Sequence, residues 1–418
     1  MGEVYEVERD IESIRLPEWG RVVATDYGVV PFVVVDPDGR PVEPIQRFLR
    51  DFLARDRSRG SVRSYAFDLH RWWRFLAVVG VSWDQATSAE VRDFVLWLGQ
   101  ADKQRRHPRT KSRATAGQVN PVTRKRHQDN RYQARTIRHS NAVLRSFYQF
   151  AIDEQSGPLV NPVKQERPRG RRANAHHNPL EPFRAEGRLR YNPKRPRQRP
   201  RAIPDERWLE LFGQMRSNRD RAILALAVSS GARAGELLGM RASDIDWGEQ
   251  LIQVRRKGSR AAQWLPASAE AFVWLRLYVD EIGEPESPND FLWQTLRRRR
   301  NGPDADLCRR PMNYEALRAV LRRANNTLGT NYSMHDCRHT AAIRMTQSRK
   351  LSVRDVQAIL GHAHLTTTQI YLVDDDNAIL QRVRQYLAER AADAEKPVEV
   401  ATGYDTGDLA VLFGGDQR

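Results

Sequence analysis

A short stretch near the C-terminal end of the chain gathers side chains that could move protons or hold an anion. The segment MHDCRHTAAIRM contains His335, Arg338 and His339, and LGHAHLTTTQIYLV adds His362 and Tyr371. His335 and His339 are four residues apart, so a helix would place them on one face. Zinc binding, a packed core and chemistry on a phosphate each explain this set of residue types.

Zinc is the weakest of the three explanations. Cys337 would point away from the face that His335 and His339 share, so it would not complete a ligand set with them. The His-Glu-x-x-His pattern of zinc proteases is absent from the chain. We therefore expect no bound metal.

Chemistry on a phosphate would also use candidate residues from elsewhere in the chain. Cleaving a phosphodiester with side chains alone requires cations around the phosphorus, a nucleophile and an acid for the leaving oxygen. Arg233 in GARAGELL follows a glycine-marked helix break, and Lys257 lies at the tip of an expected hairpin. Each also has an ordinary explanation: Arg233 as a salt-bridge partner of Glu236, Lys257 as a turn lysine, and Tyr371 as a core aromatic residue.

Helical patterns surround these residues in two blocks. In the first block, residues 44–160, SVRSYAFDLHRWWRFL and TIRHSNAVLRSFYQFAID carry apolar residues at three- and four-residue steps. TSAEVRDFVLWLG opens with Thr87 three residues before Glu90, which is the spacing of a capping box. We expect a small helical domain here, interrupted by an exposed basic loop at 102–136.

The second block, residues 202–390, is expected to form a separate domain. DRAILALAVSSGARAGELLGMRASDIDW predicts two helices interrupted at Ser229-Ser230-Gly231, and QLIQVRRKGSRAAQWLPAS predicts a β-hairpin. Helical patterns dominate from residue 313 onward, before an acidic tail at 391–418. At the other end, residues 1–43 predict a strand-turn-strand element, either an arm that touches a ligand or, slightly favoured, a lid on the first domain.

The composition fits a protein of the cell interior with more than one core. A chain of 418 residues with 40% apolar residues exceeds one ordinary domain. It has no apolar run long enough to span a bilayer, and its acidic start lacks a secretion signal pattern. Two cysteines give no disulfide framework. We expect a cytoplasmic, nucleoid-associated bacterial protein with no membrane contact.

The net charge of +17 is concentrated in two segments, which points to a polyanionic partner. Residues 103–138 hold twelve Lys and Arg against one Asp, and residues 161–201 hold thirteen against three Glu. The second segment also carries seven prolines, so we expect an extended linker. Solvated basic linkers are the simpler alternative. The DNA-contact candidates are Arg105, Arg106, Arg124, Lys125, Arg126, Lys194, Arg195, Arg197 and Arg199.

Taken in chain order, these residues resemble the tyrosine recombinase (phage integrase) family. SGARAGELLGMR is similar to the family's first motif through Arg233 and Glu236, and VRRKGSRAAQWLPAS is similar to its hairpin lysine motif through Lys257. The hairpin departs from the pattern in one extra turn residue and in Arg260, where a second lysine is common. The family's last motifs, His-x-x-Arg-His and Leu-Gly-His…Thr-Thr…Tyr, are matched by His335, Arg338, His339, His362 and Tyr371.

The resemblance covers roughly residues 44–385 and implies a mainly α fold. It implies a helical, SAM-like core-binding domain and an α-rich catalytic domain with a small β-hairpin sheet, which close on DNA as a C-shaped clamp. It also implies an enzyme in which Tyr371 forms a 3′-phosphotyrosyl bond, Lys257 acts as acid and His335 acts as base. The other matched residues would contact the phosphate (Arg233, Arg338, His362) or support the site (Glu236, His339).

The family's reaction defines the expected partners. Strand exchange through a Holliday junction implies double-stranded DNA with inverted half-sites and a homotetramer in the synaptic complex, with no cofactor, neither ATP nor a metal. The need for a directionality factor stays open. The extra segments 1–43, 102–136 and 161–201 favour an integrase or transposon recombinase that integrates or excises a mobile element.

Two other functions stay open from the sequence. One is a catalytically silent DNA-binding protein on the same fold, although the complete set of candidate residues argues against it. The other is an enzyme resembling type IB topoisomerases, which share the tyrosine chemistry. The separate core-binding pattern and His362 favour a recombinase.

Overall fold

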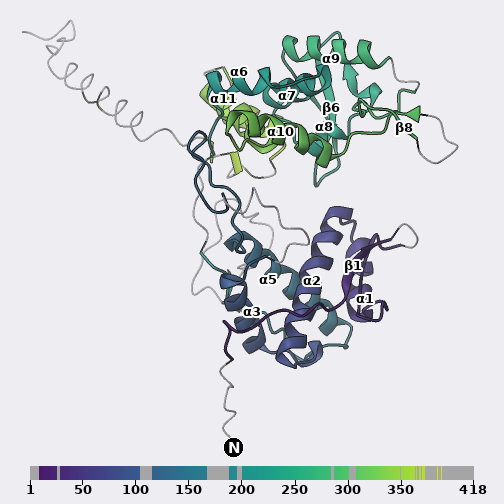
Figure 1. The fold of residues 1–418 in the computed structure, drawn as a ribbon, viewed down its shortest axis with the longest axis vertical. Helices are drawn as coiled ribbons and strands as arrows, with labels where there is room; N and C mark the ends of the chain where they lie inside the picture. Colours follow the sequence, from purple (N-terminus) through teal and green to yellow (C-terminus); the bar gives the residue numbers. More distant parts are fainter. Residues whose placement is uncertain are drawn as a thin grey trace, which may run out of the picture. The chain divides into compact units, whose positions relative to one another are not determined.

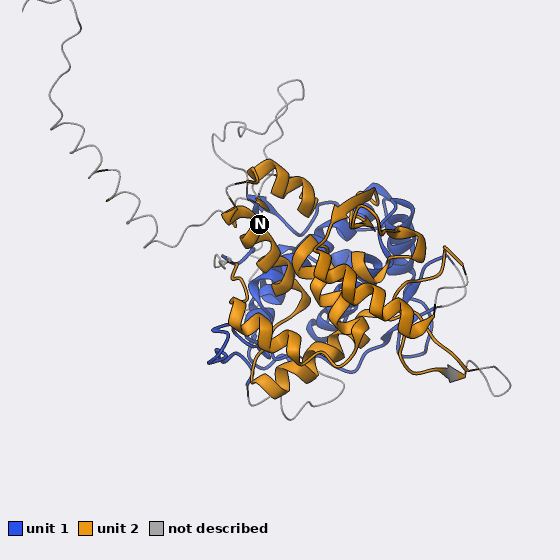
Figure 2. Ribbon diagram, turned by 90° about the horizontal axis from the view of Figure 1, so that it is seen from above, with its two compact units in different colours: residues 1–197 blue, residues 198–418 orange. Residues whose placement is uncertain are grey.

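The computed structural model divides into two compact units, residues 1–197 and 198–418, each described here by itself (Figures 1 and 2). Segments of both units are left undescribed. The residues that the structure describes are 9–25, 29–103, 115–166, 188–194, 200–283, 287–300, 307–348, 350–362, 364, 367–368, 370–371, 384 and 387.

Unit 1 is mainly helical, with short strands at its edges (Figure 1). The strands β1 and β2 form one antiparallel pair, and β3 and β4 form another. The described elements are β1 Arg21–Ala24, β2 Phe32–Val35, α1 Glu43–Ala54, α2 Arg59–Val79, the 3-10 turn η1 Trp83–Gln85, α3 Ser88–Gln100, α5 Ala134–Asp153, β3 Gln165–Glu166 and β4 Arg188–Leu189.

The core of unit 1 lies between α1, α2, α3 and α5. Trp72 of α2 is fully buried and donates from its indole Nε1 to the hydroxyl of Tyr148 on α5 at 2.9 Å. Helix α3 begins with the capping box that the sequence predicted, in which the Thr87 backbone N–H donates to Glu90 at 2.8 Å. The N-terminal segment joins the same core through Val34 of β2.

The described ends of the proline-rich segment also pack on unit 1. Val163 and Leu189 are buried in its core, and β3 pairs with β4 across the undescribed residues between them. The side-chain amide of Asn141 on α5 donates to Asn192 Oδ1 at 3.0 Å. Residues 161–166 and 188–194 of this segment are therefore attached to the helical unit.

Unit 2 is also mainly helical and contains a small three-stranded antiparallel sheet of order β5-β6-β7 (Figure 1). Its β8–β9 pair forms a second, two-stranded sheet. The described elements are α6 Asp205–Gly213, α7 Asn218–Ser230, α8 Ala234–Leu238, the 3-10 turn η2 Ala242–Asp244, β5 Ile245–Asp246, β6 Leu251–Arg255, β7 Ala262–Pro266, α9 Ala269–Ile282, β8 Arg299–Arg300, β9 Leu307–Cys308, α10 Tyr314–Leu328, α11 Met334–Gln347 and α12 Val353–Leu360.

Helix α7 is the central helix of unit 2. Its apolar residues surround the whole helix, and Ile223, Leu224 and Leu226 are all fully buried, which is the expected place for a helix without a polar face. The helix ends at Gly231, whose φ of +67° closes the last turn in the left-handed region. The chain therefore turns away from the axis of α7 at this glycine, and Arg233 follows the buried Ala232.

The predicted hairpin is present as β6 and β7. Ile252 pairs with Leu265, and both side chains are fully buried against the helices. Because strand residues alternate between faces, this register turns Val254 to the core as well. The loop at 256–261 follows, and it carries Lys257 at the exposed end of the hairpin.

The mainly α fold predicted from the sequence is confirmed by these two units. The predicted clamp around DNA stays a prediction. Among the described parts of the chain, no helix is long and apolar enough to cross a membrane.

Candidate active site

The predicted site residues come from four separate segments of unit 2. Helix α11 begins at Ser333 with a capping box to Asp336, which fixes the first turn and with it His335, Arg338 and His339. Arg233 stands at the start of α8, Lys257 follows β6, and His362 and Tyr371 follow α12. The tertiary structure has to bring these segments together.

Arg338 is the buried centre of the site. Its side chain donates to the backbone carbonyl of Gly231 at 2.6 Å and to that of Leu360 at 2.6 Å, so it joins the end of α7 to the end of α12. Burial, and next the neighbouring Arg233, lowers its pKa to about 10, which leaves it charged at neutral pH. These contacts and one with His362 occupy three of its N–H groups, and a guanidinium has five. Two donors are thus left for an anion.

Tyr371 lies against α11. Its hydroxyl is 2.9 Å from Nδ1 of His339, and its backbone carbonyl accepts from the Thr346 hydroxyl at 3.4 Å. The side chain is largely buried, and burial raises the pKa of Tyr371, although Arg338 and Arg233 oppose that rise. The structure therefore brings His339, and not His335, into contact with the tyrosine hydroxyl.

His335 lies one helical turn before His339. The two rings meet edge to face with centroids 4.2 Å apart, and His335 is exposed. From the sequence, His335 was expected to be the base and His339 to have a structural role. The geometry gives His339 the direct contact with Tyr371.

His362 is held between two partners. Its Nε2 is 2.9 Å from the Arg338 guanidinium, which can only donate, and its Nδ1 is 2.9 Å from the hydroxyl of Thr368. Burial, and then the charge of Arg338, lowers the pKa of His362 to about 4, so the ring is neutral at pH 7. With both nitrogens engaged, His362 orients Arg338 in this structure.

The carboxylate of Glu236 connects the remaining cations. Oε1 accepts from the Arg233 guanidinium at 2.8 Å and from the Lys257 backbone N–H at 3.2 Å. Oε2 accepts from the Arg233 backbone N–H at 2.9 Å and from the Arg256 guanidinium at 3.1 Å. Burial alone would raise the pKa of Glu236, but the hydrogen bonds from Arg233 and from the Lys257 backbone N–H outweigh it and lower the pKa below its usual value.

Arg256 is a site residue that the sequence analysis missed. It is only 5% exposed, whereas its neighbours Arg255 and Lys257 are exposed. A signal was available: Ile252 and Val254 face the core, so alternation places Arg256 on the same buried face. Because Arg256 lies in the cationic run RRKGSR, it has the sequence pattern of a solvated turn residue, and residue type alone does not distinguish it from its neighbours.

The cluster carries more positive charge than its one carboxylate neutralises. Arg233, Arg256 and Arg338 surround Glu236, and the nearby His362 is neutral. A half-buried group of cations with spare N–H donors binds an anion strongly, because water competes poorly there. Next to it stands a tyrosine hydroxyl with a basic nitrogen at hydrogen-bonding distance. This arrangement can activate a hydroxyl nucleophile beside a bound phosphate.

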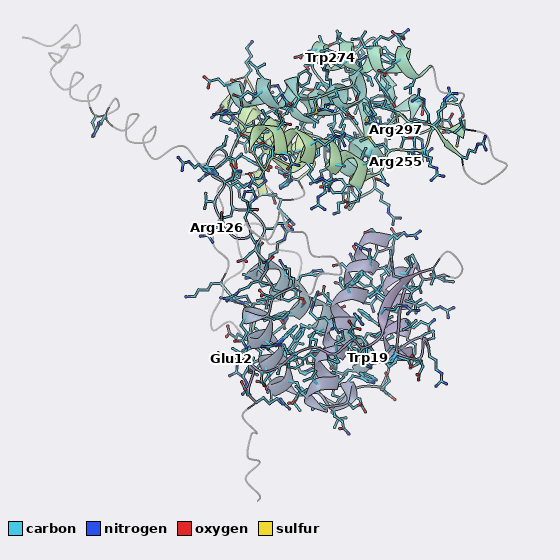
Figure 3. All side chains as sticks on the ribbon, in the orientation of Figure 1. Glu12, Trp19, Arg126, Arg255, Trp274 and Arg297 are labelled. Carbon is cyan, nitrogen blue, oxygen red and sulfur yellow. The ribbon has the colours of Figure 1, made fainter. Side chains whose placement is uncertain are left out.

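The candidate DNA-contact residues lie partly in unit 1. Arg124 and Arg126 are exposed, and Lys125 is half-buried, in a turn held by Asn120, whose side-chain oxygen accepts from the backbone N–H groups of residues 122 and 123 (Arg126 is labelled in Figure 3). Lys194 is exposed. The other candidates lie outside the described residues: Arg105, Arg106, Arg195, Arg197 and Arg199.

The surroundings of His335 and His339 differ from those of a zinc site. Cys337 is fully buried in the apolar core of unit 2, on the opposite side of α11. Within the described ranges, no group of three or more His, Cys, Asp or Glu side chains is placed to hold a metal ion.

Two family models match the chain. The model of the phage integrase family matches residues 206–378, and that of the phage integrase N-terminal SAM-like domain matches residues 45–116. The first range contains every candidate active-site residue, and the second contains most of α1 and all of α2 and α3.

Curated relatives of the chain include a tyrosine recombinase and a transposase. Tyrosine recombinase XerC of Pseudomonas syringae pv. syringae is 32% identical over 184 residues, which are 43% of this chain and 58% of that protein. The chain thus aligns with less than two thirds of that relative's length. Transposase A from transposon Tn554 of Staphylococcus aureus is 24% identical over 361 residues, which are 82% of this chain and 91% of that protein.

Solved structures share the fold. The Tn1549 transposon integrase in complex with circular intermediate DNA aligns with a TM-score of 0.51 and 14% identity, over 81% of this chain and 98% of that one. A lambda integrase dimer bound to a COC′ core site aligns with a TM-score of 0.50 and 14% identity, over 80% of this chain and 95% of that one.

We predict that Gly231→Ala destabilises unit 2 by about 1–3 kcal/mol. Its φ of +67° is unfavourable for alanine, and an added Cβ would lie 2.8 Å from a Leu360 methyl group. Urea denaturation measures the change. Gly235→Ala is the matched control, because nothing lies within 4 Å of its Cβ position, and alanine there should be neutral or stabilising. Equal effects of the two substitutions would contradict this account of Gly231.

We predict that His362 makes the folded state sensitive to acid. Since its folded pKa is about 4 and an unfolded histidine titrates near ~6.5, the unfolded chain binds a proton first as the pH falls. Stability is therefore lost between those two values, and His362→Gln should lose less over the same interval. Urea denaturation at pH 8 and at pH 5 measures both proteins, with pH 8 as the reference. Parallel losses in the two proteins would refute the prediction.

Proposed function

Because this chain belongs to the phage integrase family of tyrosine recombinases, we propose that it cleaves and rejoins DNA at specific sites through a phosphotyrosyl bond on Tyr371. One observation carries the proposal: the Tyr371 hydroxyl lies 2.9 Å from a histidine nitrogen, in a cluster whose buried Arg338 keeps donors for an anion. A nucleophile, a proton acceptor and an anion site are thus side by side.

Double-stranded DNA is the proposed substrate. The net charge of +17 and the two basic segments favour a polyanion, and exposed cations such as Arg124 and Arg126 stand on an ordered turn of unit 1. The Tn1549 and lambda integrases, which share this fold, were solved as DNA complexes. In the proposed complex the two units contact one duplex from two sides.

In the proposed first step, the Tyr371 oxygen attacks the scissile phosphorus while its proton passes to Nδ1 of His339. The bond from phosphorus to the 5′-oxygen breaks, so the DNA stays joined to Tyr371 through its 3′-phosphate. Lys257, on the exposed hairpin end, gives a proton to the departing 5′-oxygen. Arg233 and Arg338 hold the non-bridging oxygens as negative charge develops on them.

Rejoining uses the same groups in reverse. The 5′-hydroxyl of a partner strand attacks the phosphotyrosyl bond, and Tyr371 recovers its proton. Two successive exchanges through a Holliday junction require four active sites, so we propose a homotetramer on two DNA sites with inverted half-sites. The similarity to Transposase A from Tn554 over 82% of the chain favours integration or excision of a mobile element.

We predict that Tyr371→Phe abolishes covalent attachment to DNA and keeps DNA binding. Fragmented host DNA is incubated with each protein, the mixture is denatured in SDS, and protein-linked fragments are sequenced. Wild-type fragments should converge on one sequence with inverted half-sites and vanish in the variant. Linkage at scattered sites would favour a topoisomerase-like enzyme. DNA binding without any linkage would favour a catalytically silent binding protein and contradict the proposal.

We predict that His339→Gln slows formation of the phosphotyrosyl bond more than His335→Gln does. Loss of a general base costs about 100-fold or more, and of the two histidines it is His339 that lies at hydrogen-bonding distance from the Tyr371 hydroxyl. Single-turnover cleavage of the captured DNA site, with enzyme in excess, measures both variants. A larger loss in His335→Gln would indicate instead that His335 is the general base, as the resemblance to the family implies.

A further inference from the structure

We propose that Arg256 is a positioning residue for Lys257, and the inference rests on the proposed function. Lys257, the lysine of the hairpin motif, is exposed. It needs a fixed backbone if it is to deliver a proton to the leaving 5′-oxygen. Arg256 directly precedes it and is almost fully buried. Its guanidinium fixes the end of the hairpin against α8 and α12.

Burial of Arg256 is costly unless its donors are satisfied. Burial lowers its pKa, and Glu236 partly offsets this. Three donor nitrogens of the Arg256 side chain find acceptors on three different segments. Nε donates to Gln263 Oε1 at 2.8 Å across the hairpin, one terminal nitrogen donates to Glu236 Oε2 at 3.1 Å, and the other donates to the carbonyl of Ile359. A planar fork with fixed donors suits this arrangement, and a lysine would not reproduce it.

The link from Arg256 to Lys257 passes through one carboxylate. Glu236 accepts from Arg256 with Oε2 and from the Lys257 backbone N–H with Oε1, at 3.2 Å. The same Oε1 accepts from the Arg233 guanidinium. Removing the Arg256 guanidinium takes away one of the hydrogen bonds that hold this carboxylate and leaves those from Arg233, so the acceptor of the Lys257 N–H is fixed less firmly.

A glycine shows how closely the protein is built around this guanidinium. Gly361 has φ +60°, and a Cβ there would lie 2.8 Å from Arg256 Nε. The neighbouring end of α12 keeps other supports when Arg256 is removed, since Leu360 accepts from Arg338 and His362 contacts Thr368. Among the described residues, the hairpin keeps the bond from Gln263 Nε2 to the carbonyl of Ala358 at 3.0 Å and the bond from the Lys257 N–H to Glu236, whose carboxylate has lost one donor. Loss of Arg256 should therefore loosen the hairpin more than the tyrosine side of the site.

The experiment separates positioning of an acid from general support of the fold. The captured DNA site is prepared in two forms, one with the natural 5′-bridging oxygen at the scissile phosphate and one with sulfur in its place. A thiolate leaves without needing a proton, because its conjugate acid is far stronger than an alcohol. A defect in proton donation is therefore corrected by the sulfur substrate, and a defect in phosphate binding or nucleophile activation is not.

We predict that Arg256→Met lowers single-turnover cleavage of the oxygen substrate by about 10- to 100-fold and the sulfur substrate by less than about 3-fold, a partial loss of general-acid catalysis. Lys257→Ala should show the same selectivity, and Arg233→Ala should be slow on both substrates. Arg255→Met is the matched control, since Arg255 is the exposed neighbour (labelled in Figure 3), and it should cleave both at the wild-type rate.

The outcomes distinguish the two proposals. Wild-type rates for Arg256→Met on the oxygen substrate, or equal losses on both substrates, would overturn the positioning role. If wild-type protein forms no phosphotyrosyl bond with any DNA, the proposed function fails before Arg256 is tested. Circular dichroism checks folding of each variant. Should Arg256→Met fail to fold, Arg256→Lys replaces it in the test, because it keeps a positive charge beside Glu236. This variant should show the same selectivity between the oxygen and sulfur substrates in milder form. If Arg256→Lys shows no such selectivity, the positioning role of Arg256 is overturned.

Discussion

The candidate site depends on the backbone carbonyl groups at the C-terminal end of helix α12, which accept hydrogen bonds from three other segments. The last residues of any α-helix have no partner for their C=O groups inside the helix, and these groups carry partial negative charge. At the end of α12, the carbonyls of Ala358, Ile359 and Leu360 accept hydrogen bonds from Gln263, Arg256 and Arg338 respectively. Strand β7, the hairpin loop and helix α11 are thereby joined at one point.

Two of these three donors are arginines, so satisfying the helix end also concentrates positive charge. The buried carboxylate of Glu236 accepts from Arg233, Arg256 and the Lys257 backbone N–H, and its one negative charge cannot neutralise both arginines. Burial lowers the pKa of His362, and the charge of the arginines lowers it further, whereas the same charge opposes the rise that burial causes in the pKa of Tyr371. The contacts that hold the elements together thus also prepare the site for an anion.

Close approach of these arginines requires two glycines. Gly231 ends α7 and Gly361 ends α12, both with positive φ, and a Cβ on either would collide with a neighbour. At Gly231 the turn exposes the carbonyl that accepts from Arg338. At Gly361 the missing side chain leaves the space that Arg256 Nε approaches. The two glycines that end these helices therefore also allow the arginine contacts of the site.

Local patterns in the sequence predicted much of this architecture. The spacing of apolar residues predicted α2, α5 and the β6–β7 hairpin, and the capping box at Thr87 marked the start of α3. These features depend on neighbours within a few residues, which the sequence displays directly. The clustered charge and the set of chemically capable residues were likewise readable, because residue type and order carry them.

The sequence by itself therefore determined the helices, the hairpin and the chemical groups available to the site. Only the tertiary structure decided which groups meet. His335 and His339 share a helix face, yet only the packing of the segment after α12, 32 residues on from His339, selects His339 for Tyr371. Packing likewise buries Arg256 and leaves Arg255 exposed. Contacts between distant segments follow from how several elements pack at once, and spacing along the chain does not encode them.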